Sequence, residues 1–200
     1  KLLAKFSPHV AWELNQRGWA DAPYTEITLP DGGTDKQRAE ILSAAITEQA
    51  KLVRELDPNP DLQMMTTLYA EVGRFYDSGW IKVPPEVTIG FGDRGMSGMS
   101  YSDKFWTEPR DPNRKYGQYF HTNYFGGGPQ IAKCTPIDTY LKVNMDAMYE
   151  RGDTEKMLLA MNELRCQQLE IRGIAEMLWN YSVFDPKEYL LRYCSENFGE

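Results

Sequence analysis

Ionisable and amide side chains follow several apolar runs of this sequence directly. Carboxylates suit acid–base chemistry, arginine can hold a carboxylate through two parallel hydrogen bonds, and asparagine and histidine can bond hydroxyl groups. These residue types together predict a site for a polyhydroxylated, acidic ligand. The candidates in chain order are Asp31, Asp35, Asp93, Arg94, His121, Asn123, Tyr124, Asn162, Glu163 and Arg165.

Each candidate also has an ordinary structural interpretation, and spacing alone leaves both interpretations open. Short polar side chains favour turns and helix caps, and exposed ion pairs add little stability. The alternatives are a turn residue for Asp31, a helix cap for Asp35, an ion pair of Asp93 with Arg94, a structural role for His121, and surface charges for Glu163 and Arg165.

Short β-like runs alternate with longer helical ones, which is typical of an α/β protein built from βα units. Ligands of such proteins bind at the carboxyl ends of the strands, where the loops converge, so residues just after each strand are the informative ones. An eight-unit barrel needs about 250 residues, and this length holds only part of one. The predicted strands are 24–29, 62–68, 87–91, 117–122 and 157–161, the last of which is also apolar enough for a helix.

Helical patterns occupy the intervals between these runs. The Asp185-Pro186 pair divides the last helical stretch into two helices. The stretch from Met96 to Lys115 is polar and contains prolines, so we expect an irregular loop there. The predicted helices lie at 35–56, 70–76 and 137–151, with two more after residue 170.

Composition excludes several classes of partner. Of the 200 residues, 22 are Lys or Arg and 29 are Asp or Glu, giving a net charge of −7 without a basic block. Nucleic acids and anionic membranes need clustered cations, so we expect neither as a partner. The sequence has no long uncharged apolar run that could span a membrane. It opens at Lys1 without a signal-peptide pattern, which we interpret as a piece of a longer protein.

Metal and cofactor motifs receive no support from the sequence. Three cysteines without a CxxC pair and two histidines do not make a zinc site of ordinary spacing, and we expect the cysteines to be buried. The Gly90-x-Gly92-x-x-Gly95 run has dinucleotide-motif spacing but lacks the helix that must follow. We therefore expect no metal and no cofactor.

Several short motifs, in register, carry a family resemblance. The chain resembles the α-glucuronidases of glycoside hydrolase family 115, which remove glucuronic acid or its methyl ether from xylan side chains. The motifs are Leu68-Tyr69-Ala70-Glu71-Val72, Phe75-Tyr76-Asp77-Ser78-Gly79, Val83-Pro84-Pro85-Glu86-Val87-Thr88, Tyr119-Phe120-His121-Thr122-Asn123-Tyr124-Phe125-Gly126-Gly127, Met177-Leu178-Trp179-Asn180-Tyr181 and Phe184-Asp185-Pro186-Lys187-Glu188-Tyr189-Leu190.

The resemblance implies a fold and a function. Residues 1–168 would belong to a partial (β/α)8 barrel, with 157–161 as a strand, and 169–200 would be helices leading into a helical domain. The enzyme would be an inverting hydrolase that is secreted or periplasmic and acts on an acidic oligosaccharide or polysaccharide, with a homodimer as one assembly open to it. Asp93 and Glu163 would be the catalytic carboxyl groups. His121, Asn123, Tyr124 and Asn162 would bind sugar hydroxyls, and Arg94 or Arg165 the uronate carboxylate.

Two motifs depart from the family pattern. Where the family has Trp-Ala-Asp-Asp-Asn-Trp-Gly, only Asp93 matches. Where it has Gly-Asp-Leu-Lys-Pro-x-Glu, the final Glu falls on Gln168, and Glu170 could replace it only after a two-residue shift. Two alternatives therefore stay open: a carbohydrate-binding relative without catalysis, and a scaffold segment that packs on other domains.

Overall fold

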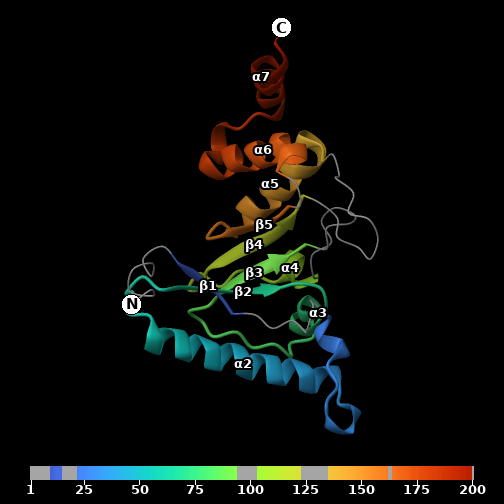
Figure 1. The fold of residues 1–200 in the computed structure, drawn as a ribbon, viewed down its shortest axis with the longest axis vertical. Coiled ribbons are helices and arrows are strands. Elements are labelled where there is room, and N and C mark those ends of the chain that lie inside the picture. Colours follow the sequence, from blue (N-terminus) through green and yellow to red (C-terminus); the bar gives the residue numbers. More distant parts are fainter. Residues whose placement is uncertain (1–9, 15–21, 94–102, 123–134, 162–163, 200) are drawn as a thin grey trace.

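The structure, a computed structural model, describes residues 10–14, 22–93, 103–122, 135–161 and 164–199. Its strands form one parallel sheet in the order β1-β2-β3-β4-β5, which curls from β1 to β5 (Figure 1). An α/β fold is therefore confirmed, and its curled parallel sheet is consistent with part of a (β/α) barrel. The strands are β1 (Ala11–Glu13), β2 (Gln63–Leu68), β3 (Thr88–Gly92), β4 (Tyr116–His121) and β5 (Met157–Ala160).

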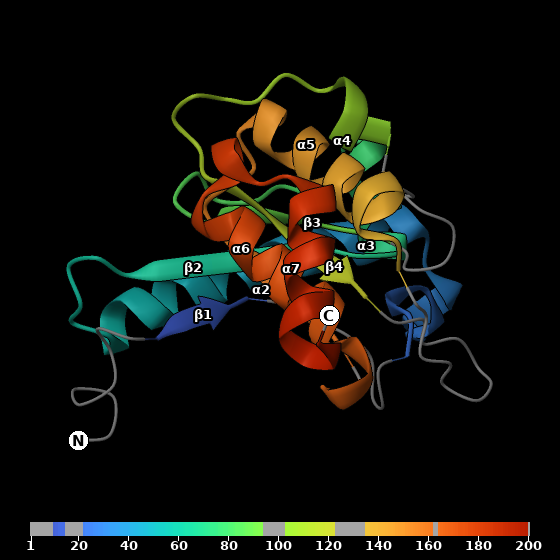
Figure 2. The ribbon, with the colours of Figure 1, turned by 90° about the horizontal axis from the view of Figure 1, so that it is seen from above.

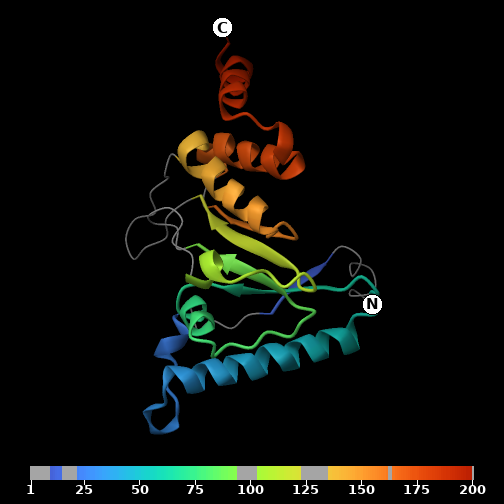
Figure 3. The ribbon, with the colours of Figure 1, turned by 180° about the vertical axis from the view of Figure 1, so that it is seen from behind.

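Helices connect the strands and flank the sheet. Helix α2 runs along the side of β1 and β2, whereas α5 and α6 lie beside β5 (Figures 1 and 3). Seen from above, α7 and α6 lie in front of the sheet (Figure 2), and Figure 1 shows that α7 lies beyond α6, at the end of the molecule opposite α2. The helices are α2 (Asp35–Leu56), α3 (Glu71–Asp77), α4 (Asp103–Thr107), α5 (Lys142–Arg151), α6 (Gln168–Trp179) and α7 (Pro186–Phe198), and a π-helical turn (Ile137–Leu141) precedes α5.

Helix α2 begins with a capping box. The Thr34 side chain accepts a hydrogen bond from the backbone N–H of Gln37, and the Gln37 side chain accepts one from the backbone N–H of Thr34. The expected N-cap at Asp35 is therefore wrong by one residue, because the hydroxyl of Thr34 reaches the exposed N–H groups first. Asp35 instead pairs with Arg38.

Two apolar clusters hold the sheet to its helices. In the first, the buried apolar side chains on one face of α2 pack against β2 and β3. In the second, Phe120 of β4 packs against α5, α6 and α7. The buried residues of the first cluster include Ala39, Leu42, Ile46, Ala50, Met64, Leu68, Ile89 and Phe91, and those of the second are Phe120, Ile137, Leu141, Met145, Met148, Ile174, Met177 and Tyr189.

The strand predicted at 24–29 is wrong. Tyr24–Glu26 is a short 3-10 helix, and the first strand of the sheet is Ala11–Glu13. The backbone N–H of Tyr24 donates to Glu71 Oε1 at 2.6 Å, so a side chain from α3 holds this segment, which pairs with none of the described strands. Asp31 and Asp35 consequently follow no strand, and Asp31 lies exposed in a turn with a φ of 61°.

The irregular segment predicted between Met96 and Lys115 is partly wrong, because Asp103–Thr107 forms helix α4. The expected burial of the cysteines is also wrong for Cys166 and Cys194, which are exposed free thiols, whereas Cys134 lies outside the described residues. Within the described ranges, no helix is long and apolar enough to cross a membrane.

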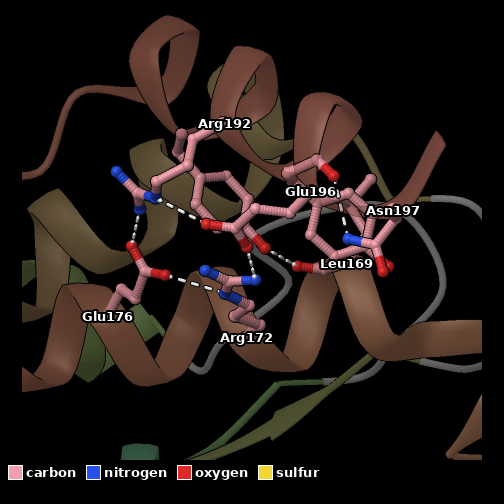
Figure 4. A network of polar contacts seen from close by, with 8 residues as sticks. Leu169, Arg172, Glu176, Arg192, Glu196 and Asn197 are labelled. Atoms are coloured by element: carbon pink, nitrogen blue, oxygen red, sulfur yellow. Dashed lines mark hydrogen bonds and ion pairs between the residues drawn. The ribbon is translucent and has the colours of Figure 1, made fainter. Parts of the chain in front are cut away.

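A network of charged side chains joins α6 to α7 (Figure 4), and the helical domain expected to follow from 169–200 stays a prediction. Arg172 bonds Glu196 at 2.5 Å and Glu176 at 3.0 Å, and Arg192 pairs with Glu176. The paired carboxylates raise the pKa of Arg172 above its ordinary value. The domain boundary at residue 168 stays a prediction.

Candidate functional site

Asp93 and His121 meet at the carboxyl edge of the sheet. The backbone N–H of His121 donates to Asp93 Oδ1 at 3.1 Å, and His121 Nδ1 lies in close contact with the same oxygen. Asp93 is 1% exposed and His121 6%. A carboxylate that bonds an imidazole fixes the orientation of the ring and can exchange a proton with it. The pair is therefore a candidate for acid–base chemistry.

The register of the sheet produces this contact. Gly92 of β3 pairs with Tyr119 of β4, and the backbone N–H of Asp93 extends the ladder to Tyr119 O at 3.0 Å. Asp93 and His121 therefore end two adjacent parallel strands at the same level. The sequence separates them by 28 residues, and the crossover between β3 and β4 brings them together.

Two tyrosines surround the imidazole. The ring centroid of Tyr119 lies 4.4 Å from that of His121, and the ring of Tyr69 lies 5.3 Å away. Both tyrosines are only half-buried. A Cβ atom on Gly92 would lie 3.1 Å from Tyr69 Cα and Cβ, so glycine is needed for Tyr69 to approach β3. Half-buried aromatic faces of this kind can pack against the apolar face of a sugar ring.

The backbone turns sharply after Tyr69. Ala70 has a φ of 49° and a ψ of −116°, a conformation that costs a non-glycine residue free energy. It precedes α3 and separates Tyr69 from Glu71. Strain of this kind concentrates at functional sites, and here it lies at the carboxyl end of β2.

Two carboxylates at this edge were missed by the sequence analysis. Glu71, 3% exposed, follows β2 and accepts the N–H of Tyr24. Its position three residues after a predicted strand was the available signal. Glu13 ends β1, a strand too short for its pattern to be recognised, and accepts the hydroxyl of Thr67 at 2.5 Å. Glu13 is an exposed residue, yet burial of its carboxyl group raises its pKa, opposed by the Thr67 hydrogen bond and by Lys156.

The segment after β5 contributes buried polar contacts. Gln167 Nε2 donates to Thr122 O at 2.9 Å, and the N–H of Thr135 donates to Glu170 Oε1 at 3.1 Å. Gln168, in contrast, is exposed. Glu170 is buried at 2% exposure and engaged by Thr135, an arrangement that explains its burial without catalysis.

The structure thus brings two of the predicted site residues together, Asp93 and His121. Arg165 is exposed in a 3-10 turn (Arg165–Gln167), and among the described candidates it pairs with none of Asp31, Asp35, Asp93 and His121. Five predicted residues lie outside the described ranges: Arg94, Asn123, Tyr124, Asn162 and Glu163.

A separate hollow of about 360 Å³ lies at the opposite, amino edge of the strands. Gln63, Thr88 and Lys115 are among its lining residues. In βα barrels this edge serves stability, and the chemistry takes place at the carboxyl edge. Among the described side chains, no group of three His, Cys, Asp or Glu is placed to hold a metal ion.

Comparisons with known proteins agree with this architecture. The sequence model of glycosyl hydrolase family 115 matches residues 4–200. A solved structure with a similar fold is that of "a novel family GH115 4-O-Methyl-alpha-glucuronidase, BtGH115A, with specificity for decorated arabinogalactans", with a TM-score of 0.74 and 17% sequence identity. The similarity covers 98% of this chain and 26% of that one, so the chain spans about a quarter of BtGH115A. No curated protein matches in sequence.

Proposed function

Because the chain belongs to glycosyl hydrolase family 115, we propose that it supplies part of the catalytic domain of a glycoside hydrolase that releases glucuronic acid or 4-O-methylglucuronic acid from glycans. The observation that carries the proposal is the buried Asp93–His121 pair at the carboxyl edge of a curled parallel sheet. This edge is where βα-built enzymes bind their substrates.

The proposed reaction is an inverting hydrolysis. One protonated carboxyl group donates to the leaving oxygen, while a second carboxylate, about 6.5–9.5 Å away, removes a proton from the attacking water. We assign these roles to Asp93 and Glu163. In support, Asp93 lies at the carboxyl end of β3, and Glu163 comes three residues after the end of β5. His121 would hold the Asp93 carboxyl group in place and share its proton.

Sugar recognition would use the remaining candidates at the same edge. His121, Asn123, Tyr124 and Asn162 would bond hydroxyl groups, and Arg94 or Arg165 would hold the uronate carboxylate through two hydrogen bonds. The rings of Tyr69 and Tyr119 would pack against the sugar.

The polymer that carries the uronic acid is xylan in this proposal. Arabinogalactan is the second substrate to compare, since BtGH115A is described as having specificity for decorated arabinogalactans. Such polymers lie outside the cell, so we place the enzyme in the secreted or periplasmic space.

A carbohydrate-binding relative without catalysis is the alternative. It is favoured by Gln168, which is exposed and stands where the family has a carboxylate. The amide of Gln168 cannot act as an acid or a base. Binding of the acidic glycan without release of sugar would support this alternative.

The test is release of uronic acid from glucuronoxylan and from arabinogalactan by the full-length protein. Asp93→Asn and Glu163→Gln should each lower kcat/KM at least about 100-fold, because each removes a proton-transfer group. Glu71→Gln tests the buried carboxylate beside Tyr69, and Gln63→Glu, at an exposed residue of the opposite edge, is the control. Proton NMR of the first product gives the anomeric configuration. Unchanged rates in both variants would refute the assignment of Asp93 and Glu163.

A further inference from the structure

Gln167 is fully buried, with 0% exposure. The oxygen and the nitrogen of its side-chain amide both bond Thr122. Its Nε2 donates to the carbonyl oxygen of Thr122 at 2.9 Å, and its Oε1 lies 3.0 Å from the hydroxyl of Thr122. Thr122, 1% exposed, directly follows His121. The side chain of Gln167, in the Arg165–Gln167 turn, therefore fastens this turn to the end of β4 by hydrogen bonds.

Further contacts tie the same point to its surroundings. The N–H of Thr122 donates to Ala160 O at 3.1 Å, which joins the ends of β4 and β5. The Thr135 hydroxyl lies 3.4 Å from Thr122 O, and Glu170 on α6 accepts the N–H of Thr135. Gln167 and Glu170 thus hold Thr122 and Thr135, the residues that border 123–134, where Asn123 and Tyr124 lie.

We propose that Gln167 is a positioning residue for the candidate site: by fixing Thr122, it holds His121 against Asp93 and sets the spacing between the end of β4 and the Arg165–Gln167 turn. This inference rests on the proposed function, because it assigns His121 and Asp93 to the catalytic site. Displacing a catalytic group by about 1 Å can cost about 100-fold in rate, so a clamp one residue from His121 affects catalysis without touching the substrate.

The amide chemistry makes the proposal specific. Glutamine supplies a donor for the Thr122 carbonyl and an acceptor for the Thr122 hydroxyl, which also lies 3.1 Å from Ala160 O. An ionised glutamate of nearly equal size keeps the acceptor and loses the donor, leaving a carboxylate facing the Thr122 carbonyl oxygen. Methionine has similar length and loses both hydrogen bonds.

The variants are therefore Gln167→Glu and Gln167→Met, with Gln63→Glu as the matched control for the same chemical change at an exposed residue. In the full-length protein, both Gln167 variants should lower kcat by roughly 10- to 100-fold while changing KM less than about threefold. Thr122→Ser, which retains the hydroxyl, should stay within about threefold of the wild type in both constants. Thermal unfolding identifies any Gln167 variant that fails to fold. Thr122→Val, which exchanges the hydroxyl for a methyl group, then takes the place of that variant.

A second measurement works without turnover. The side chain of His121 is 5% exposed and its Nδ1 faces Asp93, so an Nδ1–H proton there should give a downfield proton resonance, assigned by its loss in His121→Asn. The signal should shift or broaden in both folded Gln167 variants and persist in Gln63→Glu. An unchanged signal and an unchanged kcat in folded Gln167 variants would overturn the positioning role. If the wild type cleaves no glycan while the signal responds to Gln167, the proposed function fails and the clamp on His121 stands.

Discussion

The Oδ1 atom of Asp93 accepts the backbone N–H of His121 at 3.1 Å and also faces the ring nitrogen Nδ1 of the same residue. One carboxylate oxygen thus fixes both the backbone and the side chain of its partner. Because both residues are buried, the contact is sheltered from water, and its loss leaves polar groups without solvent to replace it. The pair is therefore a structural element as well as a candidate catalytic one.

Coupling between these two residues can be measured by a double-mutant cycle. We expect Asp93→Asn and His121→Asn each to lower the free energy of unfolding. The double variant should lose less than the sum, with an interaction energy of about 1–3 kcal/mol. Urea unfolding gives the four values. Additive losses would show that the two side chains are not coupled in solution.

The tyrosines beside His121 should affect substrate affinity more than turnover. Tyr119→Leu removes an aromatic face 4.4 Å from the His121 ring and should raise KM about 2- to 10-fold, in line with the energies of aromatic contacts. Tyr119→Phe retains the ring and should have a smaller effect. Tyr149→Leu, whose ring stacks on Tyr181 at 4.1 Å, is the control at a distant surface. Equal KM values in all three variants would rule out stacking at Tyr119.

Among the described ion pairs of arginine and lysine, that of Arg110 with Asp153 should be the most costly to break. Asp153 is fully buried at 0% exposure, and Arg110 bonds it at 2.6 and 2.8 Å while its guanidinium lies 4.5 Å from the Phe91 ring centroid. Asp153→Asn should lower the free energy of unfolding by about 3–5 kcal/mol, because it leaves a buried cation without its partner.

The control for that ion pair is Lys36→Gln, which breaks an exposed contact with Glu40 on the same face of α2. Such i,i+4 pairs contribute about 0.5 kcal/mol or less. Equal losses in Asp153→Asn and Lys36→Gln, measured by urea unfolding, would contradict the buried character of the Arg110 pair.

Stability should fall at high pH through Tyr189. Burial, with a smaller effect of Glu176, raises the pKa of Tyr189 to about 12, whereas an unfolded tyrosine titrates near 10. Between these values the folded chain retains a proton that the unfolded chain loses. The raised pKa of Tyr189 therefore stabilises the folded chain fully below pH 10, and this contribution is lost as the pH rises toward about 12.

Tyr189→Phe removes this titration together with the hydrogen bond to Leu169 O at 2.5 Å. The variant should be less stable at pH 8, by about 1 kcal/mol, and its loss of stability between pH 10 and 12 should be shallower than that of the wild type. Urea unfolding at pH 8, 10 and 12 measures both effects, with Tyr149→Phe on the exposed surface as the control. Parallel curves for Tyr189→Phe and the wild type would contradict the assignment.

Local patterns in the sequence predicted three of the five described strands and most of the described helices, and the family resemblance decided the run at 157–161, which its pattern left open between strand and helix. The runs at 62–68, 87–91, 117–122 and 157–161 correspond to β2 to β5, and each boundary differs by at most one residue. Most residues of β2, β3 and β4 are buried on both faces of the sheet, so each run is short, local and recognisable without the rest of the chain, whereas β5 is only partly buried. The carboxyl edge as the place for the candidate residues followed from the same pattern.

Tertiary structure decided which of those residues meet. Strand order and register placed Asp93 against His121, and neither is encoded in a local pattern. Tyr24–Glu26 is a 3-10 helix and not the predicted strand, because the side chain of Glu71, 47 residues from Tyr24, accepts the backbone N–H of Tyr24. In the sequence, Gln167 and Glu71 resemble ordinary polar residues. In the structure, the packing around β2, β4 and α6 buries both of them. Local periodicity reports which face of an element is apolar, whereas the partner of a buried polar group is set by contacts between distant segments, and these exist only once the chain has folded.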